Sequence, residues 1–467
     1  MNRVSAQPVR RIAILGDGFA AWLAATWLAQ QLNTKKTEIT VIGNSVDEAT
    51  ELSFAALPST PDDLLGAIGI SALDLLIQHD GAYSLGLDIE GQVVPCGAVG
   101  RAFQGAAFHH HWRLANSPQS YFQYSPSYVA LQDNRFAPPL PRNAIGGLQH
   151  EVIRHADPLS LTAALRPIAR QRGVQWVAHD AHGLNCDASH IISSIRCDDG
   201  TTVACDWVID ASGVSRLAGA DDWLTSGDAR SLSATRDVPE QPLRPCITIH
   251  SDAASWQTRI PLWQQTITVH SRIADSDTTP TPGYRQTPWI GNCVSLGASA
   301  YRSKVVLPWQ SLLLMRSIRR LLEFLPDARH MQAVRRAYNR QTSAEHAELA
   351  GFERLLECRA LPDNKRASAL GATLARRVAL WRRRGHWVNG DDTLLDHVHW
   401  TNALMAFGVE PDQHDPIAER LAAAERDTKM AELATKITQI VREFPPLSRY
   451  IEAAHRAVAE QRAGRSA

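Results

Sequence analysis

A hydrophobic segment near the start of the chain leads directly into a glycine-rich turn. Residues 11–15, RIAIL, have the composition of a buried strand, and GDGFAA follows at residues 16–21. An alanine- and leucine-rich stretch then continues to about Leu32, as a helix would. Strand, G-x-G-x-x-A turn and helix together form the dinucleotide-binding fingerprint of a Rossmann-type sheet. This feature predicts an α/β fold with a nucleotide at the end of the first strand.

The small residues of the fingerprint each have a structural reason. Gly16 allows the tight turn, Gly18 lets the backbone approach a pyrophosphate, and Ala21 lets the helix pack closely on the strand. The free N–H groups of the helix N-terminus then attract phosphates. Trp22, directly after the motif, favours FAD over a separate NAD domain. The candidate cofactor-binding residues of this segment are Gly16, Gly18, Phe19, Ala20, Ala21 and Trp22.

The second strand does not end in the acidic residue that usually binds the ribose hydroxyls. Residues 38–42, EITVI, read as this strand, and Gly43 follows them. The nearest downstream carboxylate belongs to Asp47. Two alternatives therefore stand for the fingerprint: a site for FAD, or a structural turn with nothing bound.

Length and composition limit the classes of function. The chain has 467 residues, 44% of them hydrophobic, which suffices for one large core or two closely packed ones. Its 48 basic and 48 acidic residues balance, so the charge predicts neither a nucleic acid nor an anionic membrane as partner. No apolar run approaches the roughly 20 residues of a membrane-spanning helix. The oligomeric state stays open.

The N-terminus and the cysteines predict the compartment. The first 16 residues, MNRVSAQPVRRIAILG, enter the first strand too directly to be a signal peptide. The 7 cysteines are odd in number and form no C-x-x-C pair, so reduced thiols are expected. Both observations favour a cytoplasmic protein.

Turn and cap signals place further elements. The Asp-Pro pair at 157–158 begins a helix predicted over residues 158–171, and Gly173 stops it. Apolar–polar alternation around the turn DDG at 198–200 predicts a β-hairpin over residues 191–209. Residues 208–213, VIDASG, end it as a hydrophobic strand entering a small-residue turn. That segment resembles the strand by which FAD oxidoreductases rejoin the Rossmann sheet.

The last third of the sequence is patterned as helices. From Pro308 onward almost every segment has helical spacing, including 312–325 and 430–444, each followed by proline. We therefore predict an FAD-type Rossmann sheet, similar to that of glutathione reductase, with a second β-sheet and a helical C-terminal block. The nucleotide-binding module with its inserted sheet is expected over residues 1–305. The helical block, packed on the cleft, is expected over residues 306–467.

The order and spacing of short motifs resembles the flavin-dependent tryptophan halogenases over nearly the whole chain. The glycine box with its following Trp comes first, and the other matches keep the order of that family. They are YSLG at 83–86, FHHHW at 108–112, HAD at 155–157, IDASG at 209–213, GNCV at 291–294 with Gly297, and FGVEP at 407–411 after Trp400. Each motif is short, and their common order carries the resemblance.

The resemblance implies a cofactor, partners and site residues. In that family reduced FAD reacts with oxygen and halide to give hypohalous acid, which reaches a lysine beside an aromatic substrate while a glutamate assists. It implies FAD, a flavin reductase partner and a small indole-like or other electron-rich aromatic substrate. The lysine position aligns with Ser84 and the glutamate position with Gln310, while Asp210 and Gly297 lie in segments that close around the nucleotide. The motif tryptophans are candidates to stack on a planar ligand: Trp112, Trp256, Trp309 and Trp400.

Several positions depart from the family pattern. A serine hydroxyl does not replace a lysine amine, and a glutamine cannot act as a base. The family motif W-x-W-x-I-P becomes residues 256–261 with Thr258 as its third residue, and the flavin loop becomes ELSFAALP at 51–58. Two functions follow as alternatives. One is a flavin-dependent halogenase, and the other is a catalytically inactive paralogue used for binding or partner assembly.

Three adjacent histidines, His109 to His111, invite a metal hypothesis. Adjacent side chains cannot all face one ion, and no cysteine or carboxylate is spaced near them for a site. The sequence therefore predicts structural or cleft-lining histidines and no metal.

Overall fold

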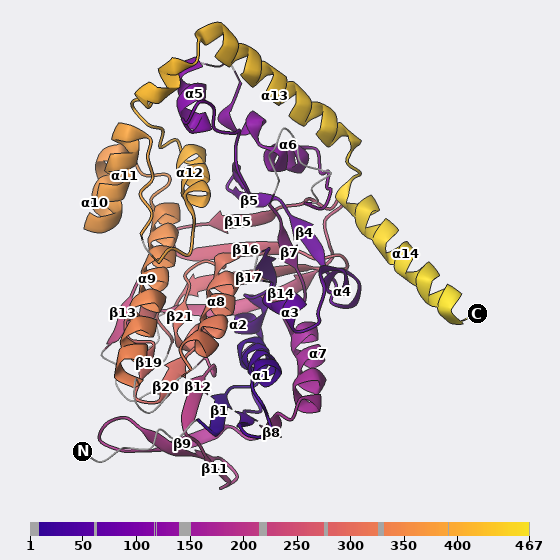
Figure 1. Ribbon diagram of the computed structural model, residues 1–467, viewed down its shortest axis with the longest axis vertical. Coiled ribbons are helices and arrows are strands. Elements are labelled where there is room, and N and C mark those ends of the chain that lie inside the picture. Colours follow the sequence, from indigo (N-terminus) through magenta and orange to yellow (C-terminus); the bar gives the residue numbers. More distant parts are fainter. Residues whose placement is uncertain are drawn as a thin grey trace.

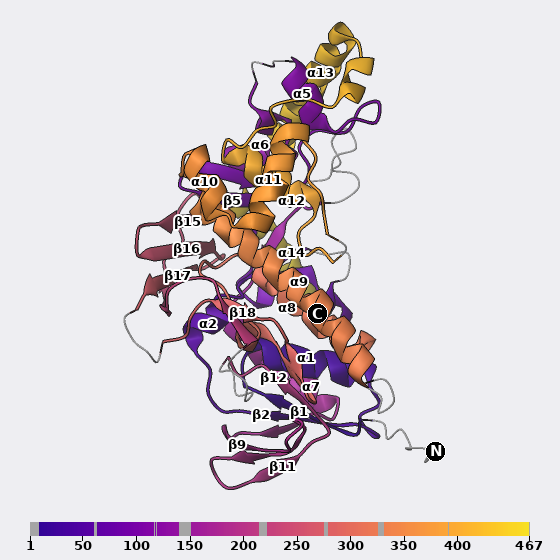
Figure 2. The same cartoon turned by 90° about the vertical axis from the view of Figure 1, so that its left-hand side faces the viewer.

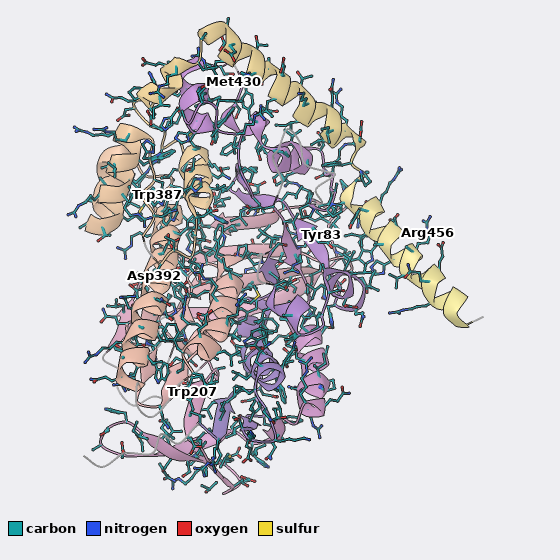
Figure 3. The ribbon with its side chains drawn as sticks, viewed as in Figure 1. Tyr83, Trp207, Trp387, Asp392, Met430 and Arg456 are labelled. Carbon is teal, nitrogen blue, oxygen red and sulfur yellow. The ribbon has the colours of Figure 1, made fainter. Side chains whose placement is uncertain are left out.

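A computed structural model of the chain describes residues 9–59, 63–115, 117, 119–139, 151–213, 222–274, 279–325, 331–390 and 392–466. Figure 1 shows a parallel sheet at one end, a second sheet in the middle and helices along one side and at the opposite end. Figure 3 labels Trp207 in the lower sheet and Met430 on the helix at the far end. The predicted α/β class with a second sheet and a helical C-terminal block is confirmed.

The main sheet has six strands in the order β19-β20-β12-β1-β2-β8. All pair in parallel except β19, which is antiparallel to β20. The first strand lies between the second strand and the returning one, so the predicted shared sheet is confirmed. The bounds are β1 (Arg11–Leu15), β2 (Glu38–Ile42), β8 (Gln175–Val177), β12 (Trp207–Asp210), β19 (Trp289–Ile290) and β20 (Cys293–Ser295).

The two faces of this sheet are covered differently. Side chains alternate along a strand, so Ile12 and Ile14 of β1 join the core under the helices, while Ala13 and Leu15 face the other side. Helices α1 (Phe19–Gln31), α7 (Pro158–Gln171) and α8 (Trp309–Glu323) contribute to the first core. A three-stranded sheet covers the second face, as Figure 2 shows for β9 and β11. Both faces are apolar, as a buried parallel sheet requires.

Helix α7 begins and ends where the sequence predicts. The Asp157 carboxylate accepts a hydrogen bond from the N–H of Leu159 at 3.0 Å, and Pro158 takes the first helical position. Gly173 follows the helix with a φ of +93°, a conformation that favours glycine.

The predicted hairpin is shorter than expected. Strands β10 (Ile192–Cys197) and β11 (Thr202–Ala204) pair around the DDG turn, and β9 (Ala181–Cys186) pairs with β10. The hairpin ends before residue 209 because the Asp206 carboxylate binds the N–H groups of Arg10 and Arg11 at 3.1 and 2.9 Å. These bonds carry the chain into β12 of the main sheet, so the extension of the hairpin to residue 209 is corrected.

The second sheet has six strands in the order β14-β17-β16-β15-β5-β6. Its bounds are β5 (Gly86–Ile89), β6 (Gln92–Pro95), β14 (Arg230–Asp237), β15 (Ile247–Ser251), β16 (Ser255–Pro261) and β17 (Thr266–Ile273). Two further three-stranded sheets lie among the described residues. They consist of β3 (Ala56–Pro58), β7 (Ile153–His155) and β4 (Ala82–Ser84), and of β13 (Trp223–Thr225), β18 (Gly283–Arg285) and β21 (Tyr301–Arg302).

The described chain from Trp309 onward is mainly helical, as predicted. Helix α8 ends at Glu323, two residues before the expected end, and Pro326 lies outside the described residues. The later helices are α9 (Met331–Glu357), α10 (Asp363–Ala369), α11 (Ala372–Arg384), α12 (His397–Ala406), α13 (Ala423–Glu443) and α14 (Leu447–Ser466). Helix α14 projects from the body of the molecule in Figure 1. The division of the chain at residues 305 and 306 stays a prediction.

Short helices connect the larger elements. They are α2 (Glu48–Leu52), α3 (Leu64–Ala67), α4 (Ala72–Gln78), α5 (Phe108–Ala115) and α6 (Pro126–Gln132), with 3-10 turns at Tyr121–Tyr124, Gly297–Ser299 and Pro416–Arg420. Among the described helices, none combines the length and the apolar character that a membrane span needs.

Candidate functional site

A cavity of about 490 Å³ lies at the carboxyl ends of three neighbouring strands of the main sheet. The segments 16–18, 211–213 and 297–298 follow β1, β12 and β20 and line it. Open α/β sheets bind ligands in this position. The other walls come from residues 45–54, from β14, from the segment 300–306 and from the start of α8.

The predicted cofactor residues divide into two groups. Gly16, Gly18, Ala20 and Gly297 line the cavity. The remaining four, Phe19, Ala21, Trp22 and Asp210, lie behind this lining and are fully buried.

Asp210 and Trp22, which lie behind the lining, form hydrogen bonds that position residues closer to the cavity. Asp210 accepts hydrogen bonds from the N–H and hydroxyl of Ser212, at 3.1 and 2.7 Å, and from Ser299 Oγ at 3.1 Å. It thereby links the turn after β12 to the turn at Gly297. Trp22 Nε1 donates to Asp17 Oδ1 at 2.8 Å, and Asp17 lines the cavity.

Asp17 is a cavity residue that the sequence analysis missed. Its Oδ2 also accepts from Arg166 Nη2 on α7 at 2.6 Å. The Arg166 guanidinium lies over the rings of Trp22 and Trp176, 5.7 and 5.2 Å from the ring centroids. Arg166 is 149 residues from Asp17, so sequence spacing gives no signal for this contact.

Gly43 stands where the fingerprint usually has a ribose-binding carboxylate. A Cβ at this position would lie 2.7 Å from the carbonyl carbon of Gly16 and 3.0 Å from the backbone N of Asp17. Any larger residue would therefore push against the glycine turn itself. Asp47, the next carboxylate along the chain, does line the cavity, where it caps α2 by accepting from Thr50 N at 3.1 Å.

The Glu51 side chain lies directly on the N-terminus of α1. Its Oε2 accepts a hydrogen bond from the N–H of Phe19 at 2.5 Å. A Cβ added to Gly18 would overlap the Glu51 carboxyl group. Glu51 is 8% exposed, and burial raises the pKa of its carboxyl to about 7. The contact joins residues 32 positions apart, so the motif that marks the loop 51–58 gives no signal for it.

A dinucleotide meets an obstacle in this arrangement. The glycine turn and the helix N-terminus are the parts of the fold that hold a pyrophosphate. Both the space over Gly18 and the N–H of Phe19 are taken by Glu51. The cavity therefore has the right place in the fold for FAD, but in this conformation a pyrophosphate does not fit at α1.

Ser84 and Gln310, the two predicted catalytic positions, differ in their surroundings. Ser84 ends β4, is completely buried and is not among the cavity-lining residues. Gln310 lies in the first turn of α8 and does line the cavity. Neither Ser84 Oγ nor Gln310 Oε1 has a hydrogen-bond partner among the described residues.

Lys304 is the only lysine among the described residues that line the cavity. Its Nζ donates to both carboxylate oxygens of Glu357, at 2.8 and 2.9 Å. The neighbouring Glu353 is buried and accepts from Tyr301 Oη at 2.8 Å and from the Lys304 N–H at 3.2 Å. Burial raises the pKa of Glu353 to about 7.

The motif tryptophans pack against other protein side chains. The Trp400 ring stacks on Trp387 with centroids 4.4 Å apart, and Trp309 meets Phe352 edge-on at 4.6 Å. Beside Trp256, Thr258 is buried in β16 and its hydroxyl donates to the Val306 carbonyl at 3.2 Å. Trp112 donates through Nε1 to the Gln119 carbonyl at 3.0 Å. Stacking on a planar ligand stays a prediction.

The three adjacent histidines are buried on α5. His109 and His111 each bond a backbone carbonyl, at 2.7 and 3.0 Å. The structure brings His386 and Asp415 to His110, with possible ligand atoms within 4.8 Å of one another, which no local spacing indicated. The N–H of Asp415 already donates to His110 Nδ1, and its carboxylate pairs with His386, both at 3.1 Å. These contacts explain the group as a tether between α5 and the C-terminal segment.

Comparison with known proteins gives one consistent family. The sequence profile described as tryptophan halogenase matches residues 11–279 and 265–423. Tryptophan 7-halogenase RebH of Lentzea aerocolonigenes is 22% identical over 351 residues, covering 62% of this chain and 65% of that protein. The matched part is thus slightly less than two thirds of that relative.

Solved structures share the fold over almost the whole chain. BrvH, a flavin-dependent halogenase from Brevundimonas sp. BAL3, superposes with a TM-score of 0.84 at 22% identity, covering 96% of this chain and 99% of that one. Xcc4156, a flavin-dependent halogenase from Xanthomonas campestris, gives a TM-score of 0.83 at 22% identity with the same coverage.

Proposed function

The chain belongs to the tryptophan halogenase family, and on that premise we propose that it keeps the nucleotide-binding fold but does not halogenate aromatic substrates. FAD is the cofactor of this family. The proposal adopts the inactive paralogue, which acts through binding or partner assembly.

The residues at the two catalytic positions carry this proposal. Ser84 has no amine with which to hold or polarise an electrophilic halogen species, and Gln310 has no carboxylate to accept a proton. Ser84 is also fully buried outside the cavity that Gln310 lines. Loss of groups of this kind typically lowers a rate by roughly 10²–10⁴-fold each.

Lys304 is the obvious candidate to replace the missing amine. Its ammonium is held by two charge-assisted bonds to Glu357, which fix its direction. A lysine held in this way is a poor substitute for a free amine beside a substrate.

The test is a halogenation assay of the purified chain. The protein is supplied with FAD, a flavin reductase, oxygen and chloride or bromide, together with tryptophan, indole and a panel of electron-rich aromatics. Mass spectrometry then looks for the halogen isotope pattern, with tryptophan 7-halogenase RebH as the positive control. We expect no halogenated product from this chain or from its Ser84→Lys variant, because Gln310 and Thr258 would remain.

A halogenated product from the unaltered chain would overturn the proposal. The Lys304→Met variant then identifies the cause, because loss of product in that variant would assign the amine role to Lys304. The second candidate function is halogenation of an indole or other electron-rich aromatic with reduced FAD, oxygen and halide. Its support is the cavity at the sheet edge with Gln310 in its wall, and a flavin reductase and a small aromatic substrate would be its partners.

A further inference from the structure

The N-terminus of α1 holds a protein carboxyl group where its fingerprint predicts a ligand phosphate. Glu51 reaches this point from α2, 32 residues further along the chain. It bonds the N–H of Phe19 and covers Gly18, the two features that a pyrophosphate would use. No other described residue occupies both features.

We propose that Glu51 occupies the pyrophosphate subsite of the cavity and thereby sets the affinity of this chain for FAD. FAD binds tightly only when the Glu51 side chain leaves the N-terminus of α1. This inference rests on the proposed retention of the nucleotide cavity.

The first argument is steric. Glycine at position 18 leaves room for a ligand to approach the backbone, and here the Glu51 carboxyl fills that room. Glu51 is itself among the cavity-lining residues. A pyrophosphate and this carboxyl group therefore cannot share the place over Gly18.

The second argument is the charge around the site. Asp17 and Asp47 also line the cavity next to the glycine turn. Arg166, a cation beside Asp17, lies 2.6 Å from its carboxylate and makes no hydrogen bond or ion pair with Glu51 in the described part of the chain. Arg230, Arg302 and Lys304 also line the cavity, but each bonds other protein groups. The three carboxyl groups next to the glycine turn therefore disfavour a ligand that brings two further negative charges to that point.

Glu51 can also be replaced without leaving a buried cation unpaired. Its carboxylate accepts a hydrogen bond from the N–H of Phe19 on α1, and no ion pair joins it to another described residue. Glu48 on the same helix differs, because its exposed carboxylate pairs with Arg236 at 3.3 Å. Glu51 faces the cavity and Glu48 faces solvent, so a substitution of Glu48 is a suitable control for a substitution of Glu51.

The test measures flavin affinity of the full chain with three variants. Glu51→Ala frees the subsite, Glu51→Gln keeps the size of the side chain without its charge, and Glu48→Gln is the control. Binding of FAD is followed by flavin fluorescence and calorimetry, and binding of riboflavin, which lacks the pyrophosphate, is measured in parallel. Circular dichroism and thermal melting confirm that each variant is folded.

We expect Glu51→Ala to tighten FAD binding by at least tenfold, with Glu51→Gln between it and the unaltered chain. Glu48→Gln is expected to stay within about twofold of the unaltered chain, because Glu48 lies outside the cavity lining. Riboflavin affinity is expected to be unchanged by Glu51→Ala, since only the pyrophosphate meets Glu51.

Three results would overturn the inference. Equal or weaker FAD binding by Glu51→Ala would show that Glu51 supports the site, and an equal gain for riboflavin would show a general opening of the cavity. FAD binding by none of the variants would show that the freed helix N-terminus is no phosphate site. A halogenated product in the separate assay would refute the proposed lack of activity and leave the role of Glu51 standing.

Discussion

Replacing Glu345 by Gln should destabilise the wall of the cavity that α8 provides. Glu345 on α9 is completely buried, and its carboxylate takes two bonds from the Arg320 guanidinium on α8, at 2.9 and 2.7 Å. Arg320 is 7% exposed, whereas Arg316, which also reaches Glu345 at 2.7 Å, is partly exposed. The same helix α8 carries Gln310 into the cavity.

The expected loss of unfolding free energy follows from the bonds that the Arg320 guanidinium loses when Glu345 becomes an amide. Glutamine keeps one acceptor oxygen but turns an N–H₂ group toward the guanidinium, so one charge-assisted bond worth about 1.5–3 kcal/mol is lost. The Arg320 charge then stays buried with reduced compensation. Breaking a buried pair in this way costs about 3–5 kcal/mol. We expect Glu345→Gln to lower the free energy of unfolding by that amount.

The measurement is chemical denaturation followed by tryptophan fluorescence and circular dichroism. Glu425→Gln is the control, because Glu425 and Lys429 form an exposed pair on α13 at 3.3 Å, worth about 0.5 kcal/mol or less. The double variant Arg320→Met with Glu345→Leu should recover most of the loss, since no buried charge remains. A cost below about 1 kcal/mol for Glu345→Gln, or no recovery in the double variant, would refute the reasoning.

Two further predictions concern the glycine turn and pH. Gly43→Ala should lower the free energy of unfolding by about 1–3 kcal/mol, because its Cβ would meet the Gly16 backbone at 2.7 Å, while Gly390→Ala, with open space around it, should be nearly neutral in the same denaturation assay. Glu353 has a folded pKa of about 7 against 4.5 for an ordinary glutamate, so between pH 5 and 7 the folded state holds a proton that the unfolded state releases. Its contribution to stability is therefore present below about pH 4.5 and is lost as the pH rises toward 7, by about 3 kcal/mol in all. The difference in unfolding free energy between the unaltered chain and Glu353→Gln should fall over that range, and a flat difference would contradict the assigned cause.

The sequence alone determined those features that local pattern encodes. Strand, glycine turn and helix over residues 11–31 follow from composition and spacing, and α7 follows from its Asp-Pro start and Gly173. The order of motifs indicated the family, which the family profile confirms. Alignment with that family then identified the substitutions at Ser84 and Gln310. These inferences succeed because they depend on backbone preferences and on side chains within a few residues of one another.

The tertiary structure decided which side chains share the site. The contact between Glu51 and Phe19 spans 32 residues, that between Arg166 and Asp17 spans 149, and the bonds of Asp206 to Arg10 and Arg11 that shorten the hairpin span almost 200. No periodicity relates such residues, because packing of helices and loops on the sheet brings them together. The sequence therefore predicted a phosphate-binding turn, while only the folded chain revealed that one of its own carboxyl groups lies on it.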